Sequence, residues 1–391
     1  MAADLPNRSA SARRPHNSLE HHDSAQITLA YSQDAGIVAI AGGEQYRWAH
    51  TALEESGFLR GNAGVYRLPT KDGDTSRAAV ADLLLSAERH RTNVTVSSRR
   101  FIGDVARDIA RLLPGRWDTT VEIYAHPVWQ GDLVPWLWDS GELSRAVQTS
   151  RVPYAATLTD SESGTALLLV ERPSHQLDYL VGAFAPMPLN DGYGDEHAPR
   201  DIVLPSSPGR AAQAISDRLL PAYERAVNAR RAATVASALS RIRAKLDTWK
   251  AALATTGYGD ANPIAIDQVG ETTAEFLEDA WLEFLTVLDL APGLLDQCRP
   301  ADSPWPEDAE ALGHLADALT EAESIHEDLS DASPLSRRSM NARMWPSVES
   351  WLAHGTVFLR QARAAGTPSG PAVPLTPAPL KALPPAPAPR R

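Results

Sequence analysis

The sequence predicts an α+β protein with an N-terminal mixed α/β layer plus β-meander, a C-terminal antiparallel helical bundle, and disordered N- and C-terminal tails. Three observations predict this class. Strand-like and helix-like apolar patterns alternate over residues 25–126, strand-like runs separated by turns follow within 127–207, and helical spacing alone continues over 208–365. With 391 residues, the chain is long enough for two or three domains of about 150 residues.

The first layer opens with two apolar runs, 25–31 and 36–41, separated by the turn-forming letters "SQDA", and this pattern predicts a β-hairpin. Apolar positions at helical spacing predict a helix over 44–56, and Gly57 followed by Phe58 is typical of its C-terminal stop. Further elements are expected in the order strand 64–69, helix 75–90, strand 93–97, helix 101–113 and strand 119–125.

Residues 127–207 hold a tryptophan-rich segment and then a predicted β-meander, which is expected to continue the first domain. The segment 127–143, "PVWQGDLVPWLWDSGEL", carries three tryptophans and two prolines. Residues 153–186 contain three strand-like runs, with a turn at 160–164 between the first two, so a meander is the simplest arrangement. A loop rich in Pro, Gly and Asp is expected over 187–207.

Four amphipathic helices are expected after Pro208. The first has apolar residues spaced 4, 3, 4, 3, 4 between Val235 and Leu253, as in helices that pack lengthwise. Thr272 and Glu275 predict the capped start of the second helix, and the letters "APG" at 291–293 predict its end. The third should follow the "SPWP" segment 303–306, and the fourth should run from about residue 346 to 365. Short connections between such helices favour an antiparallel bundle.

Both ends of the chain have compositions that do not build a core. Residues 1–24 are polar and aperiodic, and residues 366–391 contain nine prolines, including the PxxP spacings "PAVP" and "PLTP". The sequence therefore predicts two disordered tails. The proline-rich tail is either a docking strip for an aromatic groove or a flexible terminus.

Composition limits the functional classes. A net charge of −12 disfavours wholesale wrapping of nucleic acid, and the one cysteine, Cys298, excludes an internal disulfide framework. No secretory signal is expected at the N-terminus, and no run of 18 apolar residues occurs, so we expect a cytoplasmic protein without a membrane partner. Only four of the 37 basic residues are lysine, which is typical of a high-GC bacterium.

The glycine pair Gly42 and Gly43 between a predicted strand and helix has the outline of a phosphate-binding loop. A dinucleotide fingerprint needs a third glycine, and a P-loop needs Gly-Lys-Ser/Thr, whereas this segment continues "EQYR". Glu44 would complement the positive helix end and repel a phosphate. We therefore interpret the pair as a corner and keep anion binding as a weaker alternative.

A second loop gathers hard ligands in "NDGYGDEHAPRD", residues 190–201. Its weak metal candidates are Asp191, Asp195, Glu196 and His197. The order does not match an EF-hand, so a solvated loop is the preferred interpretation and no metal or other cofactor is expected. No nucleophile elbow or paired catalytic motif is present, so the sequence favours a protein that is not an enzyme.

The tryptophan segment and the charge pattern supply the partner candidates. Trp129, Trp136 and Trp138 form either an aromatic recognition surface or a cap on the core. Residues 210–250 carry nine basic and three acidic side chains, whereas residues 255–335 carry nineteen acidic and one basic. The charges either satisfy one another inside the bundle or leave a face for a partner. The arginines that nucleic acid would contact are Arg225, Arg230, Arg231, Arg241 and Arg243.

The sequence thus supports a preferred function and two alternatives. The preferred one is a cytoplasmic accessory protein that binds a protein partner through the charged bundle and the tryptophan segment. The first alternative is a nucleic-acid-associated protein, as in a mobile element, that uses the arginine-bearing helix. The second is a nucleotide-handling enzyme that uses the glycine pair.

Overall fold

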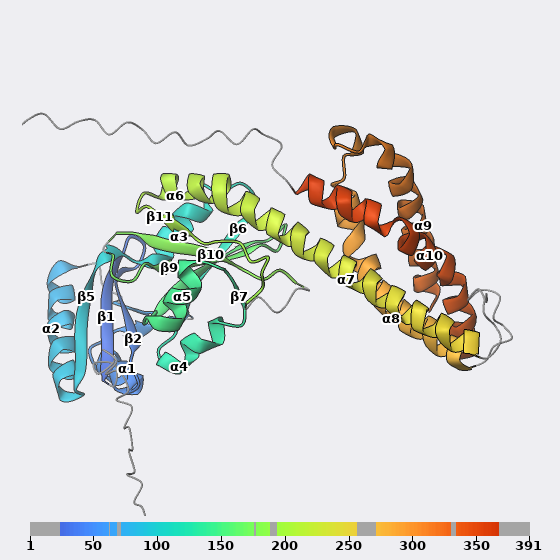
Figure 1. Cartoon of the computed structure of the whole chain (residues 1–391). Helices are drawn as coiled ribbons and strands as arrows, with labels where there is room; N and C mark the ends of the chain where they lie inside the picture. Colours follow the sequence, from blue (N-terminus) through green and yellow to red (C-terminus); the bar gives the residue numbers. More distant parts are fainter. Residues whose placement is uncertain are drawn as a thin grey trace, which may run out of the picture. The chain divides into compact units, whose positions relative to one another are not determined.

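A computed structural model describes residues 24–61, 63–68, 72–175, 177–187, 194–255, 271–329 and 334–366. It confirms the predicted fold class, with mixed α/β structure followed by helices (Figure 1). The chain divides into two units, Met1–Arg230 and Arg231–Arg391, and each is described here by itself. The predicted arm 1–24 lies outside the described residues except for its last position, and the proline-rich tail lies outside them beyond Gly366.

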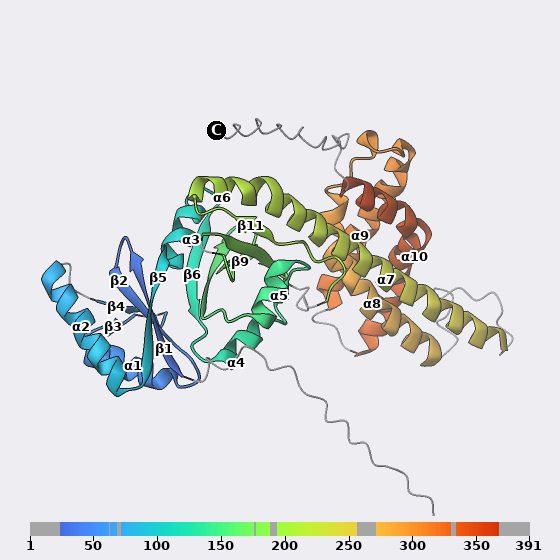
Figure 2. The same ribbon diagram turned by 60° about the vertical axis from the view of Figure 1, so that its left-hand side comes forward.

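The first sheet of the N-terminal unit contains the predicted hairpin and has the strand order β3-β4-β2-β1-β5. The hairpin strands pair antiparallel, and β1 pairs with β5 in parallel. Two of the predicted helices cover one face of this sheet, α1 and α2 (Figures 1 and 2). The bounds are β1 Ala25–Ser32, β2 Gly36–Gly42, α1 Tyr46–Glu55, β3 Leu59–Arg60, β4 Tyr66–Arg67, α2 Gly73–Arg89 and β5 Thr92–Arg100.

Successive side chains of a strand point to opposite sides, and those of β2 are buried on both faces of this first sheet. Ile27 and Ala39 pack with Leu53 of α1 on one face. On the other face, Val38 and Ile40 belong to a core that includes α3, Ile102–Ala110. Helix α3 therefore joins the first sheet to the rest of the unit.

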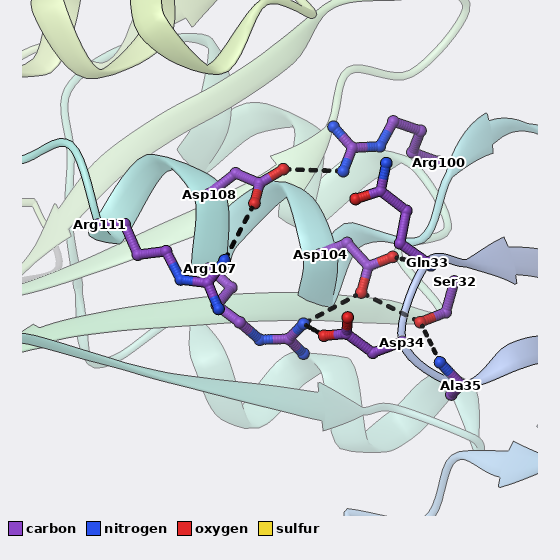
Figure 3. Close-up of polar contacts among 9 residues, drawn as sticks. All are labelled: Ser32, Gln33, Asp34, Ala35, Arg100, Asp104, Arg107, Asp108 and Arg111. Atoms are coloured by element: carbon purple, nitrogen blue, oxygen red, sulfur yellow. Dashed lines mark hydrogen bonds and ion pairs between the residues drawn. The ribbon is translucent and has the colours of Figure 1, made fainter.

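A buried carboxylate on α3 fastens the hairpin turn. Asp104 is 2% exposed, and it accepts hydrogen bonds from Ser32 Oγ at 3.1 Å and from the Gln33 amide at 2.7 Å. Arg107 lies 3.4 Å from the same carboxylate and also pairs with Asp34 in the turn (Figure 3). Because these donors satisfy both oxygens, the cluster is a structural clamp.

The second sheet has the order β11-β10-β9-β8-β6, and β7 pairs with β10. The predicted meander is present in β8, β9 and β10, which pair antiparallel in succession. The strand predicted at 119–125 belongs to this sheet, because β6 pairs with β8. The bounds are β6 Trp117–Ile123, β7 Leu137–Trp138, β8 Tyr154–Asp160, β9 Ala166–Glu171, β10 Tyr179–Phe184 and β11 Ile202–Leu204.

Helices cover both faces of the second sheet as well. On one face, Leu158 and Leu169 pack with α3 and with the helical stretch 208–227. On the other, Leu168 and Leu180 pack with the segment that carries α4 and α5. The helical bounds here are α4 Pro127–Gln130, η1 Gly131–Leu133, α5 Glu142–Thr149, α6 Pro208–Ala214 and the π-helical turn η2 Ile215–Leu219.

The C-terminal unit is the predicted bundle. Its helices are the later part of α7 Leu220–Thr255, α8 Glu271–Leu295, α9 Ala309–Leu329 and α10 Pro334–Ala365, with short 3-10 turns η4 Pro300–Asp302 and η5 Pro306–Asp308. The later part of α7 meets the early part of α8, since Trp249 stacks on Phe276 with ring centroids 5.0 Å apart. Asp308, just before α9, pairs with Arg360 near the end of α10. These end-to-start contacts are those of antiparallel neighbours.

Several details differ from the sequence expectation. The division follows Arg230, whereas the predicted boundary lay at 207/208, because the side chains of 211–227 complete the core of the first unit. Helix α5 was not predicted, although Leu143, Ala146 and Val147 have helical spacing and are buried. Pro292 lies inside α8, whereas it was expected to end that helix. Pro346 lies inside α10, whereas it was expected to begin that helix. A proline removes only one backbone donor, and tertiary packing outweighs that loss here.

Among the described residues, no helix combines the length and the apolar character that a membrane crossing requires.

Candidate functional site

The clearest aromatic site is a pocket of about 590 Å³ in the N-terminal unit, which we call the aromatic pocket. Its walls come from the beginning of α1 and from α4, two segments about 80 residues apart in the chain. The large apolar side chains remain unusually open: Trp48 is 42% exposed, Trp129 43% and Val128 70%. The full lining is Glu44, Gln45, Tyr46, Arg47, Trp48, His126, Val128 and Trp129.

The rings of Tyr46, His126 and Trp129 stand at an angle to one another, with Tyr46 half-buried and Trp129 exposed. The Tyr46 and Trp129 ring centroids lie 5.2 Å apart at 60°, and the His126 ring lies 6.0 Å from that of Trp129. Such tilted clusters offer several aromatic faces within the reach of one small ring or side chain. Glu44 and Arg47 supply one charge of each sign at the rim.

A network of partly buried hydrogen bonds fixes the two walls. The carbonyl oxygen of Ala125 accepts from the Gly43 amide and from Arg151 Nη2, at 2.9 Å each. Arg151 also donates to Gln130 Oε1 at 3.1 Å, and Gln130 ends the short helix that carries Trp129. Burial lowers the pKa of Arg151 to about 10. The site is therefore largely preformed, which reduces the cost of binding.

The glycine pair makes the corner that positions Tyr46. Gly43 has φ +98°, and a Cβ there would overlap the Ser24 carbonyl oxygen, so only glycine fits. Its amide is already bonded to Ala125, and Gly42 pairs with Gln26 at the end of β2. These contacts favour the corner interpretation over anion binding by Gly42 and Gly43.

A short relay of polar groups lies behind Tyr46. The Tyr66 hydroxyl donates to Glu54 Oε1 at 3.0 Å, so His50 Nδ1, at 2.8 Å, donates to that hydroxyl oxygen. Burial, followed by the hydrogen bond to Glu54, raises the pKa of Tyr66 to about 12. Burial, followed by the nearby charge of Arg60, lowers the pKa of His50. The relay anchors α1 and keeps the imidazole neutral.

The structure separates the three candidate tryptophans. Trp138 is 1% exposed, packs edge-on against Tyr223 and donates from Nε1 to Asp195 Oδ2 at 3.0 Å. It is therefore a core residue, which rules it out as a partner-binding candidate and agrees with the other interpretation, a cap on the core. Trp136 is 56% exposed but does not line the aromatic pocket. Only Trp129 of the three lies in this pocket.

In the described part of the candidate metal loop, the acidic side chain of Asp195 is bonded to other residues of the protein. Asp195 accepts from Trp138 and from the His197 amide, and it pairs with Arg230 at 3.4 Å. Glu196 is exposed and lies 3.7 Å from His197, while Asp191 lies outside the described residues. Within the described parts of the chain, no three histidine, cysteine or acidic side chains are grouped as a metal site.

Three of the five candidate arginines have internal partners. Arg230 pairs with Asp195, Arg241 Nε lies 2.6 Å from Glu283 Oε2 on α8, and Arg243 donates to the Leu352 carbonyl. Lys245 also reaches Glu283, at 3.4 Å. Two of the five, Arg225 and Arg231, have no ion pair among the described residues. The charges of α7 and α8 are thus partly satisfied inside the bundle.

A pocket of about 820 Å³ in the helical unit is a weaker candidate. Its Trp305 ring is covered by Arg360, whose guanidinium carbon lies 4.9 Å from the ring centroid. Arg360 pairs with Asp308, and Gln361 Nε2 donates to the Trp305 carbonyl at 2.8 Å. Its main polar groups are thus directed at one another.

Sequence reasoning found Trp129 but missed Tyr46, Trp48 and His126 as partners of one site. Tyr46 was used only as an apolar position of the helix, and His126 precedes the segment in which the tryptophans were counted. The sequence does not show which side chains remain exposed. Helical spacing places Trp48 beside the buried face of α1, but it does not reveal that the ring stays in solvent.

Comparisons with known proteins give no relative: no family model matches the chain, and neither a curated protein nor a solved structure matches it.

Proposed function

We propose that this chain is a protein-interaction module, without enzymatic activity of its own, whose aromatic pocket binds a proline-rich segment. The observation that carries the proposal is one pocket lined by two exposed indoles, Trp48 and Trp129, beside the half-buried ring of Tyr46. Proline-rich segments dock in aromatic-lined grooves because proline rings stack on aromatic faces and the extended segment loses little entropy.

The chain itself supplies a probe of the right kind. Residues 366–391 contain nine prolines and end in two arginines. Those arginines would complement Glu44 at the rim of the pocket. A second copy of this chain, or another protein with a similar segment, would be the partner.

The bundle would add a second contact in this proposal. Acidic residues of α9, such as Asp317, Glu321 and Glu327, are exposed and have no ion pair within the described residues. Their field would attract a basic partner. The nucleic-acid alternative has less support, since most of its candidate arginines are engaged. We place the activity in the cytoplasm, in keeping with the single cysteine, which is buried.

The test is a binding titration with a labelled peptide of residues 366–391. The protein is the chain ended after Gly366, so that its own tail does not compete and every described helix and strand is retained. We expect saturable binding that weakens at least tenfold in Trp129→Ala, because loss of an aromatic anchor costs about 2 kcal/mol or more.

Two controls make this test specific. Trp136→Ala removes an exposed tryptophan from the same segment but outside the pocket, and it should leave the affinity unchanged. A peptide with alanine at Pro371, Pro374 and Pro377 should bind weakly. No binding of the native peptide, or equal loss in both tryptophan variants, would contradict the proposal.

A further inference from the structure

Three arginines from separate elements of the N-terminal unit line another pocket, of about 680 Å³, which we call the arginine pocket. Arg145 comes from α5, Arg200 from the segment before β11 and Arg218 from η2. Arginines on α3 and on the edge strand β5 have acidic partners, for example Arg99 with Glu171 and Arg107 with Asp34. The guanidinium groups of the three pocket arginines, by contrast, make no hydrogen bond or ion pair with any residue that the structure describes, although the charge of Arg145 acts on Glu142 and that of Arg200 on Asp139.

The acidic residues of this pocket do not neutralise its three arginines. The Glu142 carboxylate is held by Arg172, which donates at 2.7 Å and 2.9 Å and is not part of the lining. Asp201 Oδ1 accepts from the Glu142 amide at 2.7 Å. Burial, followed by repulsion from Asp139, raises the pKa of Asp201. Three arginines against two carboxylates, those of Glu142 and Asp201, leave the lining with an excess of positive charge.

The backbone around the pocket also suits an anion. Carbonyl groups at the end of α5 would repel one, but Gln130 Nε2 donates to the carbonyls of Val147 and Ser150, at 2.5 Å and 2.7 Å. The hydroxyl of Ser150 faces no protein partner among the described residues and lies in the lining. It adds a neutral donor to the three guanidinium groups.

The π-helical turn is a second, independent sign of a functional position. Residues 215–219 interrupt an otherwise continuous helix from α6 into α7, and both Ile215 and Leu219 are fully buried. Arg218 lies within this turn and reaches the pocket. Turns of this kind are rare and are enriched at functional sites, because the extra residue changes the direction of a side chain.

We propose that the arginine pocket binds a small phosphorylated molecule through Arg145, Arg200 and Arg218. Planar guanidinium groups donate paired hydrogen bonds that match phosphate oxygens, and three of them suit a group with more than one negative charge. The pocket is larger than a phosphate ion alone requires, and Ala146 and Val203 provide apolar walls for an organic part. A concave site favours a terminal phosphate over a continuous nucleic-acid backbone.

The test is calorimetric titration of the full chain with inorganic pyrophosphate at low salt. We expect one saturable site, with affinity at least tenfold weaker when all three arginines are changed to glutamine. Arg218→Lys keeps the charge but loses the paired donors, so it should weaken binding by a smaller factor. Arg116→Gln, an exposed arginine of the same unit outside the pocket, should bind like the wild type.

Other outcomes would overturn the assignment. Absence of binding, or equal affinity in the triple variant and Arg116→Gln, would show that the pocket is not a phosphate site. If citrate bound as tightly as pyrophosphate, the pocket would be a site for carboxylates and not for phosphates. If an oligonucleotide bound more tightly than pyrophosphate, and this binding required the three arginines, the ligand would be a nucleic acid and not a small molecule. An unchanged circular dichroism spectrum must accompany each variant.

Discussion

At the scale of single residues, the polar groups around the aromatic pocket act mainly as supports. Arg151 and Gln130 hold the wall that carries Trp129, and the relay from His50 through Tyr66 to Glu54 holds α1. None of these roles was predicted from the sequence. Each depends on residues distant in the chain, such as His50 and Tyr66, whose contact only the fold creates.

His50 makes the stability of the protein depend on pH. Its pKa is lower in the folded state than the unfolded value near 6.5, so the unfolded chain binds more protons as the pH falls through that value. The free energy of unfolding should therefore decrease between about pH 7.5 and about pH 5.5. His50→Gln keeps an amide that can donate to Tyr66 and should reduce this decrease. Calorimetry of both proteins at the two pH values checks it, and parallel behaviour would contradict the assigned role.

At the scale of elements, the strand-to-helix corner shows what sequence patterns can and cannot specify. The strand, the glycine pair, the helix and its stop at Gly57 all follow from local preferences, and each is present. Local preferences did not show what the corner does. The Gly43 amide donates to the carbonyl of Ala125, about 80 positions away in the chain, and is therefore not available to bind an anion. The corner instead positions one wall of the aromatic pocket.

Gly43→Ala should be strongly destabilising. The new Cβ would meet the Ser24 carbonyl, and the positive φ adds strain, so we expect a loss of about 2 kcal/mol or more in the free energy of unfolding. Gly209→Ala is the matched control, because it lies in α6 with open space around it and should cost nothing. Denaturant unfolding measures both. Equal stability of the two variants would show that the corner tolerates a side chain.

At the scale of the whole molecule, each hydrophobic core lies within one unit. The bundle core contains residues between Ala232 and Ala362, whereas the three other clusters draw on residues between Ala25 and Val227. Periodicity predicted both parts, because helical and strand spacing reflect burial directly. The predicted boundary lies at 207/208, whereas the division follows Arg230, since the side chains of 211–227 pack in the core of the first unit.

Because the cores are separate, a mutation in the core of one unit should leave the stability of the other unit unchanged. Phe284→Ala empties a fully buried position of α8 and should destabilise the bundle by about 3–5 kcal/mol. In the full chain, amide exchange should accelerate within 231–366 and stay unchanged within 25–227. Leu282→Ala, at a 59% exposed position of the same helix, should change neither region. Faster exchange throughout the chain in Phe284→Ala would contradict independent cores.

Fluorine NMR can observe directly whether the aromatic pocket binds a proline-rich segment, as we propose. The chain ended after Gly366 is labelled with fluorotryptophan, and Trp48→Phe and Trp129→Phe assign the two pocket resonances among the ten tryptophans. On addition of the peptide 366–391, we predict that the resonances of Trp48 and Trp129 shift while those of the buried Trp138 and Trp351 stay in place. Unchanged pocket resonances at saturating peptide would contradict the claim.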